Sequence, residues 1–209
     1  ILPLMGQDLS EGQSFLDNEQ FNQAIKFFSR ILESHPDNTE ALNGLAKARR
    51  LSGDSMSAIK SYQKSISINP NQPEVWMSIG NIQYHQKSFP EAASSFQKAV
   101  TLNPSNPLAH NNLASVFKEQ GIVDKAIYHF KKAFEFDPAY GLVCRNLGDI
   151  YLNSGRPEQA KHWLKIAVKV DPENLYGHYW LGKAYYQSLE FEKARDQYFH
   201  VLSKKPNLP

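Results

Sequence analysis

The chain has 209 residues, of which 41% are hydrophobic and 21% are charged, a balance typical of soluble proteins. Its net charge of +2 gives no basic field of the kind that attracts nucleic acid, and no run of residues approaches the roughly 18 apolar residues of a membrane span. We therefore expect a soluble protein that neither binds nucleic acid nor inserts into a membrane, with the cytoplasm favoured over the periplasm or export. The single cysteine, Cys144, cannot form an internal disulfide and leaves the redox compartment open.

A proline recurs every 34 residues through nearly the whole chain. Because proline lacks a backbone N–H and clashes with the preceding helical turn, this spacing predicts a recurrent helix end. An alanine stands twelve residues before each proline, and a glycine or alanine stands twelve residues before that alanine. The prolines are Pro36, Pro70, Pro104, Pro138, Pro172 and Pro206; the alanines are Ala24, Ala58, Ala92, Ala126, Ala160 and Ala194; the small residues are Gly12, Ala46, Gly80, Ala114, Gly148 and Gly182. The pattern predicts two amphipathic helices per period, joined by a short turn.

In chain order, the six periods cover about residues 5–38, 39–72, 73–106, 107–140, 141–174 and 175–208. The first copy is degenerate, because Glu11 stands where the other copies have leucine or isoleucine. The last helix, at about residues 191–202, presents Tyr198, Val201 and Leu202 at core-like spacing, and we expect no C-terminal capping helix. Uncovered apolar faces of this kind favour a homo-oligomer that forms through the terminal faces.

The columns resemble the tetratricopeptide repeat (TPR) family, whose signature is W-x2-L-G-x2-Y, then A-x3-F, then P, at a 34-residue period. The third copy reads Trp76, Ile79 and Gly80, followed by Ala92, Phe96 and Pro104. The resemblance implies an all-α fold, a right-handed αα superhelix of six helix-turn-helix repeats, which we expect to form one solenoid domain over residues 1–209. The run from Asn111 to Ala114 also resembles the repeats of protein O-linked N-acetylglucosamine transferases.

The repeated columns are expected to form the core rather than a binding site. Small residues on one helix let its partner approach closely, and bulky residues one turn away fill the space beside that contact. A single pair cannot bury its apolar face, so each pair must stack on its neighbours. On the convex side, Phe27 and Trp163 stand in an otherwise polar column, and we interpret each as a lone apolar surface side chain.

The sequence offers little for catalysis or metal binding. It has no glycine-rich phosphate loop, no H-E-x-x-H, no paired cysteine spacing and no G-x-S-x-G. The seven histidines fall on different columns, although His110, Cys144 and His178 share one. No acid shares that face to orient a Cys-His nucleophile, so a buried small-polar stripe is the favoured interpretation. We predict a protein that is not an enzyme and that needs neither metal nor cofactor.

Binding is the favoured function, because the family resemblance implies a concave groove lined by the first helix of each repeat. Carried over column by column, the resemblance gives these candidate residues for binding a peptide or partner: Asn43, Lys47, Asn81, Tyr84, Asn111, Asn112, Arg145, Asn146, Asp149, Tyr176, Tyr179, Trp180, Lys183 and Tyr186. The charges of the groove are mixed, which favours a mixed peptide over a strongly acidic one.

Two features of this set carry the binding hypothesis. Asn112 and Asn146 share a column and resemble the asparagine ladder by which some family members hold a peptide backbone; the alternative is ordinary solvated surface. Four aromatic residues of the last copy are expected binding anchors, or else they pack against a further segment or a second subunit: Tyr176, Tyr179, Trp180 and Tyr186.

Three functions stay open at this point. The favoured one is a non-enzymatic scaffold or adaptor that holds an extended peptide or a partner helix in the concave groove. The second is a structural platform that self-associates into an assembly. The third is the substrate-recruiting region of a larger enzyme such as a glycosyltransferase. The sequence names neither the partner nor the process.

Overall fold

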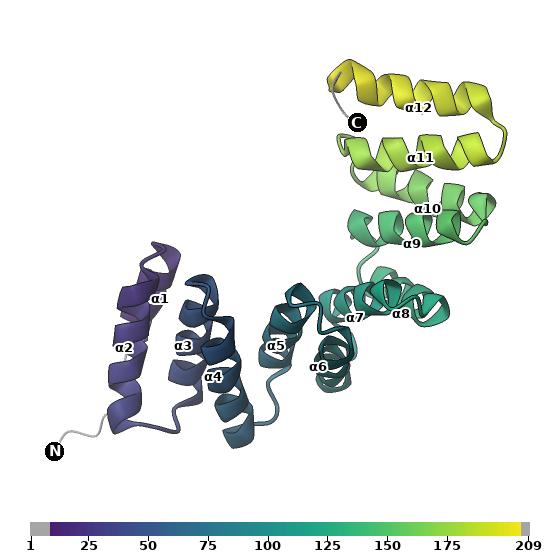
Figure 1. Ribbon diagram of the computed structural model, residues 1–209. Helices are drawn as coiled ribbons and strands as arrows, with labels where there is room; N and C mark the ends of the chain where they lie inside the picture. The colour runs from purple at the N-terminus through teal and green to yellow at the C-terminus, as the bar shows by residue number, and fades with distance from the viewer. Residues whose placement is uncertain (1–8, 206–209) are drawn as a thin grey trace. The chain divides into compact units, whose positions relative to one another are not determined.

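The computed structural model describes residues 9–205, and this part of the chain folds into twelve α-helices that form six consecutive pairs (Figure 1). The first helices of the pairs are α1 (Ser10–Asp17), α3 (Thr39–Leu51), α5 (Pro73–His85), α7 (Pro107–Glu119), α9 (Gly141–Asn153) and α11 (Leu175–Gln187). The second helices are α2 (Phe21–Ser34), α4 (Ser55–Ile68), α6 (Phe89–Leu102), α8 (Val123–Phe136), α10 (Pro157–Val170) and α12 (Phe191–Lys204). The predicted all-α array of six helix pairs is confirmed; Pro206 lies outside the described residues.

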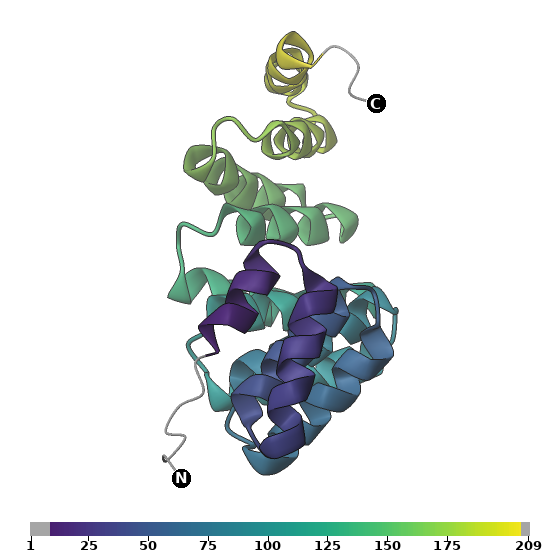
Figure 2. The ribbon, with the colours of Figure 1, turned by 90° about the vertical axis from the view of Figure 1, so that its left-hand side faces the viewer.

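The chain divides into two compact units, residues 1–103 and residues 104–209. In the first unit, α1 to α6 form three pairs, and Figure 2 shows the first of these, in purple, with its two helices side by side. In the second unit, α7 to α12 form the other three pairs. The prediction of one continuous solenoid domain stays a prediction, and each unit is described by itself below.

Three of the first helices begin where the period places an asparagine. The side-chain oxygen of Asn38 accepts a hydrogen bond from the backbone N–H of Ala41 at 2.9 Å, and Asn106 and Asn174 cap α7 and α11 in the same way. Such a cap satisfies one of the backbone donors that the first helical turn leaves unpaired. The recurrent proline stands in the connection before each of these caps, which confirms the predicted helix ends for the described copies.

Close contact at the small-residue column holds each pair together. A Cβ atom added to Gly80 would lie 2.7 Å from the Phe96 ring, and one added to Gly182 would lie 2.7 Å from the Tyr198 ring. The six alanines of the second helices are almost completely buried, as expected for the core. Val201 of α12 is also buried, whereas Leu202 is largely exposed, so only part of the predicted terminal stripe is uncovered.

The turn inside each pair places one residue in the left-handed backbone region. Those residues are Glu19, Gly53, Lys87, Gly121, Gly155 and Leu189, and their φ angles lie between 57° and 93°. They recur at the same 34-residue period as the prolines. Glycine reaches this region without strain, whereas a residue with a Cβ pays a conformational cost there.

We expect Leu189→Gly to stabilise the second unit by about 0.5–1 kcal/mol, because relief of roughly 1–2 kcal/mol of left-handed strain exceeds the entropy cost of a glycine. The matched reverse change, Gly155→Ala, should destabilise the same unit by about 1 kcal/mol. Denaturant unfolding followed by circular dichroism measures both changes. Equal unfolding midpoints for the two variants and the wild type would show that the turn stores no strain.

Candidate functional site

A hollow of about 370 Å³ lies on the first helices of the first unit. Side chains from α1, α3 and α5 form most of its lining, and residues of α2 and α4 complete its floor: Leu9, Gln13, Leu16, Phe28, Glu40, Asn43, Gly44, Lys47, Tyr62, Glu74, Val75 and Ser78. Two predicted binding residues, Asn43 and Lys47, line this hollow. The other two on this unit do not: Asn81 is exposed, and the half-buried ring of Tyr84 packs 5.7 Å from that of Phe89.

A hydrogen-bond network fixes the amide of Asn43 in one orientation. The Nε2 group of Gln72 donates to the backbone oxygens of Asn69 and Ser65 at 2.7 and 3.2 Å, so its Oε1 must turn the other way. That oxygen accepts from Nδ2 of Asn43 at 2.8 Å. The Oδ1 atom of Asn43 is buried and has no hydrogen-bond partner among the described residues. An acceptor left in this state costs free energy until a donor reaches it.

The second unit repeats this arrangement on α7. Asn111 occupies the same column as Asn43, and it is only 6% exposed. Its Nδ2 donates to Oδ1 of Asn112 at 3.2 Å, and its own buried Oδ1 has no partner within residues 9–205. Asn146, the next member of the predicted ladder, is half-buried on α9. The ladder of Asn112 and Asn146 stays a prediction, whereas the unpaired acceptors lie one column earlier.

Two interactions connect the first helices of the second unit. Lys118 of α7 forms an ion pair with Asp149 of α9, whose other oxygen accepts from Asn153 at 3.0 Å. The Arg145 guanidinium of α9 lies 5.9 Å from the ring centroid of Tyr176 on α11. Of the predicted site residues, Arg145, Asp149 and Tyr176 are therefore joined across neighbouring first helices.

The predicted aromatic anchors on α11 differ in their surroundings. Tyr176 and Tyr186 are 60% and 59% exposed. Tyr179 is half-buried, and its ring lies 6.0 Å from that of Tyr198 on α12. Trp180 is also half-buried, with the Lys183 ammonium 4.6 Å from its ring centroid. Tyr176 is thus better placed for a ligand than Tyr179, which packs inside its own helix pair.

A pair of buried histidines joins α7 to α8. Nε2 of His110 lies 3.0 Å from the carbonyl oxygen of Pro104, which can only accept, so Nε2 carries the proton. Nδ1 of His110 then accepts from Nδ1–H of His129 at 2.9 Å. Burial, with the His110 and Lys125 charges as lesser causes, lowers the pKa of His129 to about 4, and burial also lowers the pKa of His110. Both rings are therefore neutral at pH 7 and serve the packing of this repeat.

The single thiol of the chain lies within the helix packing. Cys144 is buried, and burial raises the pKa of its thiol to about 11, so it stays protonated at neutral pH. Within residues 9–205, no three histidine, cysteine or acidic side chains gather closely enough to hold a metal ion. No helix in that range is both long and apolar enough to cross a membrane.

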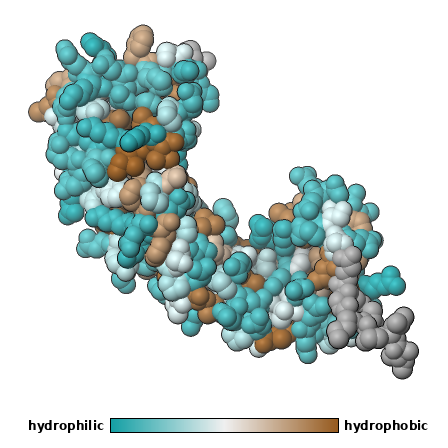
Figure 3. Space-filling view, turned by 180° about the vertical axis from the view of Figure 1, so that it is seen from behind, coloured by the Kyte–Doolittle hydropathy of each residue, from teal (hydrophilic) through white to brown (hydrophobic). Residues whose placement is uncertain are grey.

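Figure 3 shows that hydrophilic residues cover most of one face of each unit.

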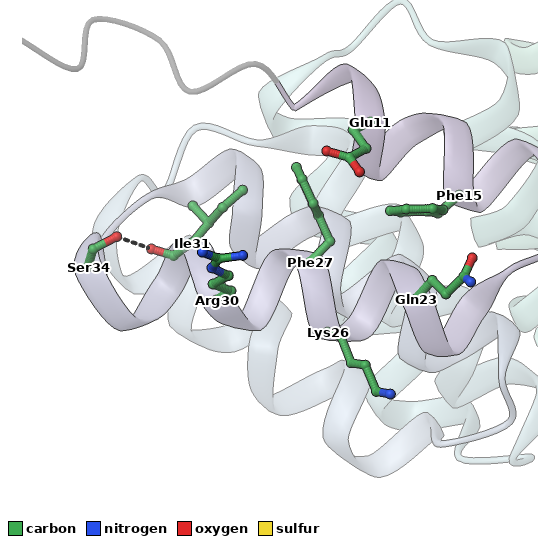
Figure 4. Close-up of a pocket in the computed structure, with 8 residues that line it drawn as sticks. All are labelled: Glu11, Phe15, Gln23, Lys26, Phe27, Arg30, Ile31 and Ser34. Carbon is green, nitrogen blue, oxygen red and sulfur yellow. Dashed lines mark hydrogen bonds between the residues drawn. The ribbon is translucent and has the colours of Figure 1, made fainter.

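A second and larger hollow, of about 720 Å³, lies on α1 and α2 (Figure 4). Its lining consists of Glu11, Phe15, Gln23, Lys26, Phe27, Arg30, Ile31 and Ser34. Phe15 points toward Phe27 there, with ring centroids 6.2 Å apart, and the ring centroid of Phe27 also lies 5.5 Å from that of Phe28. The interpretation of Phe27 as a lone surface side chain is therefore wrong. The same correction holds for Trp163, whose ring lies 5.1 Å from that of Phe134.

Comparison with known families assigns the chain. The model of the tetratricopeptide repeat matches residues 9–73, and a TPR repeat model matches residues 80–121 and 148–188. The chain belongs to the tetratricopeptide repeat family. No curated protein sequence matches it. The resemblance to the repeats of O-linked N-acetylglucosamine transferases has no support in these matches.

Solved structures with the same fold include three TPR proteins. MamA is 21% identical, with a TM-score of 0.76 over 82% of this chain and 93% of its own. YrrB, described as a TPR protein with an unusual peptide-binding site, is 18% identical, with a TM-score of 0.74 over 86% of this chain and 93% of its own. PilF of Pseudomonas aeruginosa is 18% identical, with a TM-score of 0.80 over 96% of this chain and 91% of its own. At these identities the likeness shows the fold alone.

The histidine pair makes a pH-dependent contribution to stability. Because the folded-state pKa of His129 is depressed, this contribution is complete above the unfolded pKa of about 6.5 and is lost as the pH falls toward about 4. In that window we expect the free energy of unfolding to fall with a slope approaching about 1.4 kcal/mol per pH unit for each proton taken up.

The sixth repeat supplies the control variant. There, Nε2 of His178 also lies 3.0 Å from a proline carbonyl, but its Nδ1 lies 2.8 Å from the amide of Gln197. His129→Gln copies that pair and removes one titrating ring. Urea unfolding from pH 7.5 to pH 4 should show a shallower pH dependence for His129→Gln than for the wild type. Identical slopes would mean that the pair does not titrate with folding.

Proposed function

We propose that the protein is a non-enzymatic scaffold that binds an extended segment of a partner protein along the first helices of its repeats. The observation that carries this proposal is Asn43, which lines the 370 Å³ hollow and whose buried Oδ1 has no hydrogen-bond partner among residues 9–205. A backbone N–H of an extended peptide can pair with this acceptor, once the Asn43 side chain turns toward the hollow, without dependence on the peptide's sequence. Binding then relieves a cost that the free protein carries.

The rest of the hollow suits a peptide of mixed character. Phe28, Tyr62 and Val75 offer apolar surface, whereas Glu40, Glu74 and Lys47 place two acids and one base at the same site. A strongly acidic peptide would be repelled by the two carboxylates. We infer that the first unit prefers a peptide that carries at least one basic residue beside apolar ones.

The second unit offers a comparable set of groups on α7, α9 and α11. Asn111 supplies the unpaired acceptor, and the Lys118–Asp149 ion pair keeps two first helices in register. Tyr176, held beside Arg145, offers a largely exposed aromatic surface that has few rotatable bonds to immobilise on binding. These features support the same mode of binding in the second unit.

Family membership and residue chemistry favour the non-enzymatic interpretation. TPR domains typically mediate protein–protein interactions, and the related fold of YrrB is described with a peptide-binding site. The only thiol has a raised pKa, which makes it a poor nucleophile, and the histidine pair has lowered pKa values that keep both rings neutral. Each of these groups has a structural explanation in the helix packing.

Asn43→Ala and Asn111→Ala should each weaken peptide binding by about 1–3 kcal/mol, because the peptide N–H loses its acceptor on binding. The probe is a displayed library of random dodecapeptides, selected on the wild-type protein. Enriched peptides are then synthesised and titrated against each variant by fluorescence anisotropy. Asn22→Ala, which changes an exposed asparagine on α2, is the matched control and should leave the affinity unchanged. Full affinity in both asparagine variants would overturn the proposed role of the acceptors.

Tyr176→Ala should weaken binding at the second unit by about 1–2 kcal/mol, because a rigid aromatic contact is lost. Tyr128→Ala is the matched control, since Tyr128 is a similarly exposed tyrosine on α8. The comparison uses those selected peptides that lose affinity in Asn111→Ala. If both tyrosine variants bind these peptides as the wild type does, Tyr176 is not an anchor.

A further inference from the structure

The 720 Å³ hollow on α1 and α2 is lined by apolar side chains of the kind that usually pack against another helix, but no described residue fills it. Phe15, Phe27 and Ile31 give it an apolar floor, and Lys26 and Arg30 stand at its margin. Neither cation forms an ion pair within residues 9–205. The peptide groove uses a different face, because only residues outside this set line the smaller hollow.

The junctions inside the second unit show what covers the equivalent surface in later repeats. Between the fourth and fifth pairs, Phe134 of α8 packs against Trp163 of α10 with ring centroids 5.1 Å apart. Between the fifth and sixth pairs, the ammonium groups of Lys161 and Lys165 on α10 lie 5.9 and 5.8 Å from the ring centroid of Tyr185 on α11. In both junctions, the second helix of one repeat covers these columns of the next repeat.

The 34-residue period identifies the equivalent positions in the first and last described pairs. Phe27 stands in the column of Trp163, and Phe15 stands in the column of Tyr185. On the covering side, Leu202 of α12 stands in the column of Phe134, and Phe199 stands in that of Lys165. The hollow thus has the receiving columns of a junction, and α12 has the covering columns.

Among the described residues, α12 exposes large apolar side chains beside its charged ones. Phe199 is 72% exposed and Leu202 is 48% exposed. In the five earlier repeats, the column of Phe199 holds only serine, glutamine or lysine. A large aromatic side chain in that column is unfavourable in water and suits contact with another aromatic ring.

We propose that α12 of one copy of this chain packs into the α1–α2 hollow of a second copy and repeats the internal junction between molecules. In this contact, Leu202 of one copy packs on Phe27 of the other, and Phe199 packs on Phe15. The contact is heterologous, since it joins two different surfaces, so successive copies assemble head to tail.

Charge complementarity supports a second copy as the occupant. Arg195 stands in the column of Lys161, whose ammonium lies over Tyr185 in the internal junction. By the same geometry, Arg195 of one copy would lie over Phe15 of the next copy, and Glu11 is one helical turn from Phe15. Glu11 is the acid that stands where the other copies have leucine or isoleucine, and it lines the hollow beside Phe27 (Figure 4). The same face of α12 also carries Glu192 and Asp196, which suit the cations at the margin of the hollow.

The test uses the full chain and two variants that each lose one surface. Phe27→Asp blocks the hollow, and Phe199→Asp blocks the α12 face. Analytical ultracentrifugation should show a wild-type mass that rises with concentration beyond that of a dimer, whereas each variant alone should remain monomeric. Mixed in equal amounts, the two variants retain one competent pair of surfaces and should form a 1:1 dimer that grows no further. Met56→Asp, at an exposed apolar position on α4, is the control and should assemble like the wild type.

Three outcomes would overturn the proposal. One is a wild-type protein that stays monomeric at every concentration. If Phe27→Asp also unfolds at a lower midpoint than this monomeric wild type, the hollow is covered by another part of the same chain. Another is a mixture of variants that gives no dimer. The third is association of either variant by itself, which would assign assembly to another surface. Circular dichroism checks the fold, and Leu202→Asp or Phe27→Ser replaces any variant that loses its helical signal.

Discussion

The contact between a small residue on one helix and a bulky ring on its partner is the constraint on which the rest of each repeat depends. Phe28 makes this contact with two helices, because atoms of its ring would clash with a Cβ added to either Gly12 of its own pair or Gly44 of the next pair. The ring therefore lies against two backbones at once and forms part of the floor of the smaller hollow. The later repeats hold serine, asparagine or tryptophan in the column of Gly44, whereas a Cβ added to Gly44 would lie too close to the Phe28 ring. The packing contact therefore also shapes the surface on which we propose that a peptide binds.

Much of the fold could be predicted from the sequence, because columns that obey one packing rule must repeat together. The prolines, alanines and small residues each have one permitted environment, and the described structure places them there. The left-handed turn was less visible, since Glu19, Lys87 and Leu189 share it with three glycines and so hide the column. The hydrogen-bonding state of the site residues was harder still to predict from the sequence. Asn43 and Asn111 were predicted as contacts, but their unpaired oxygens depend on neighbours such as Gln72 and Asn112, which no single column reveals. The prediction for the convex side was wrong at Phe27 because surface exposure was judged one residue at a time.

The columns of Phe15 and Phe27 hold different kinds of interacting pairs in different repeats. In the second pair the same two columns hold Arg49 and Ser61, joined by a 2.8 Å hydrogen bond, and in the third they hold Gln83 and Ser95, joined at 2.7 Å. In the fourth they hold Phe117 and His129, whose rings stack 5.7 Å apart. The second, third and fourth pairs thus fill these columns with side chains that contact one another locally. The fifth pair holds Tyr151 and Trp163 there, and Trp163 packs against Phe134 of the preceding pair. Only the first pair fills both columns with phenylalanine, whose ring makes no hydrogen bond with water.

The proposed peptide binding and the proposed head-to-tail assembly use different columns, and this separation has an energetic consequence. An extended peptide loses conformational entropy on binding, so a single hollow with one unpaired acceptor supports only a modest affinity. Each unit repeats the acceptor column, and each further copy in an assembly would repeat both units. When a partner carries several suitable segments, the second binding event becomes intramolecular and its effective concentration rises. A scaffold built from weak, repeated sites can therefore hold a multivalent partner firmly while it releases a monovalent one, and the strength of the contact between α12 and the α1–α2 hollow would set how many sites act together.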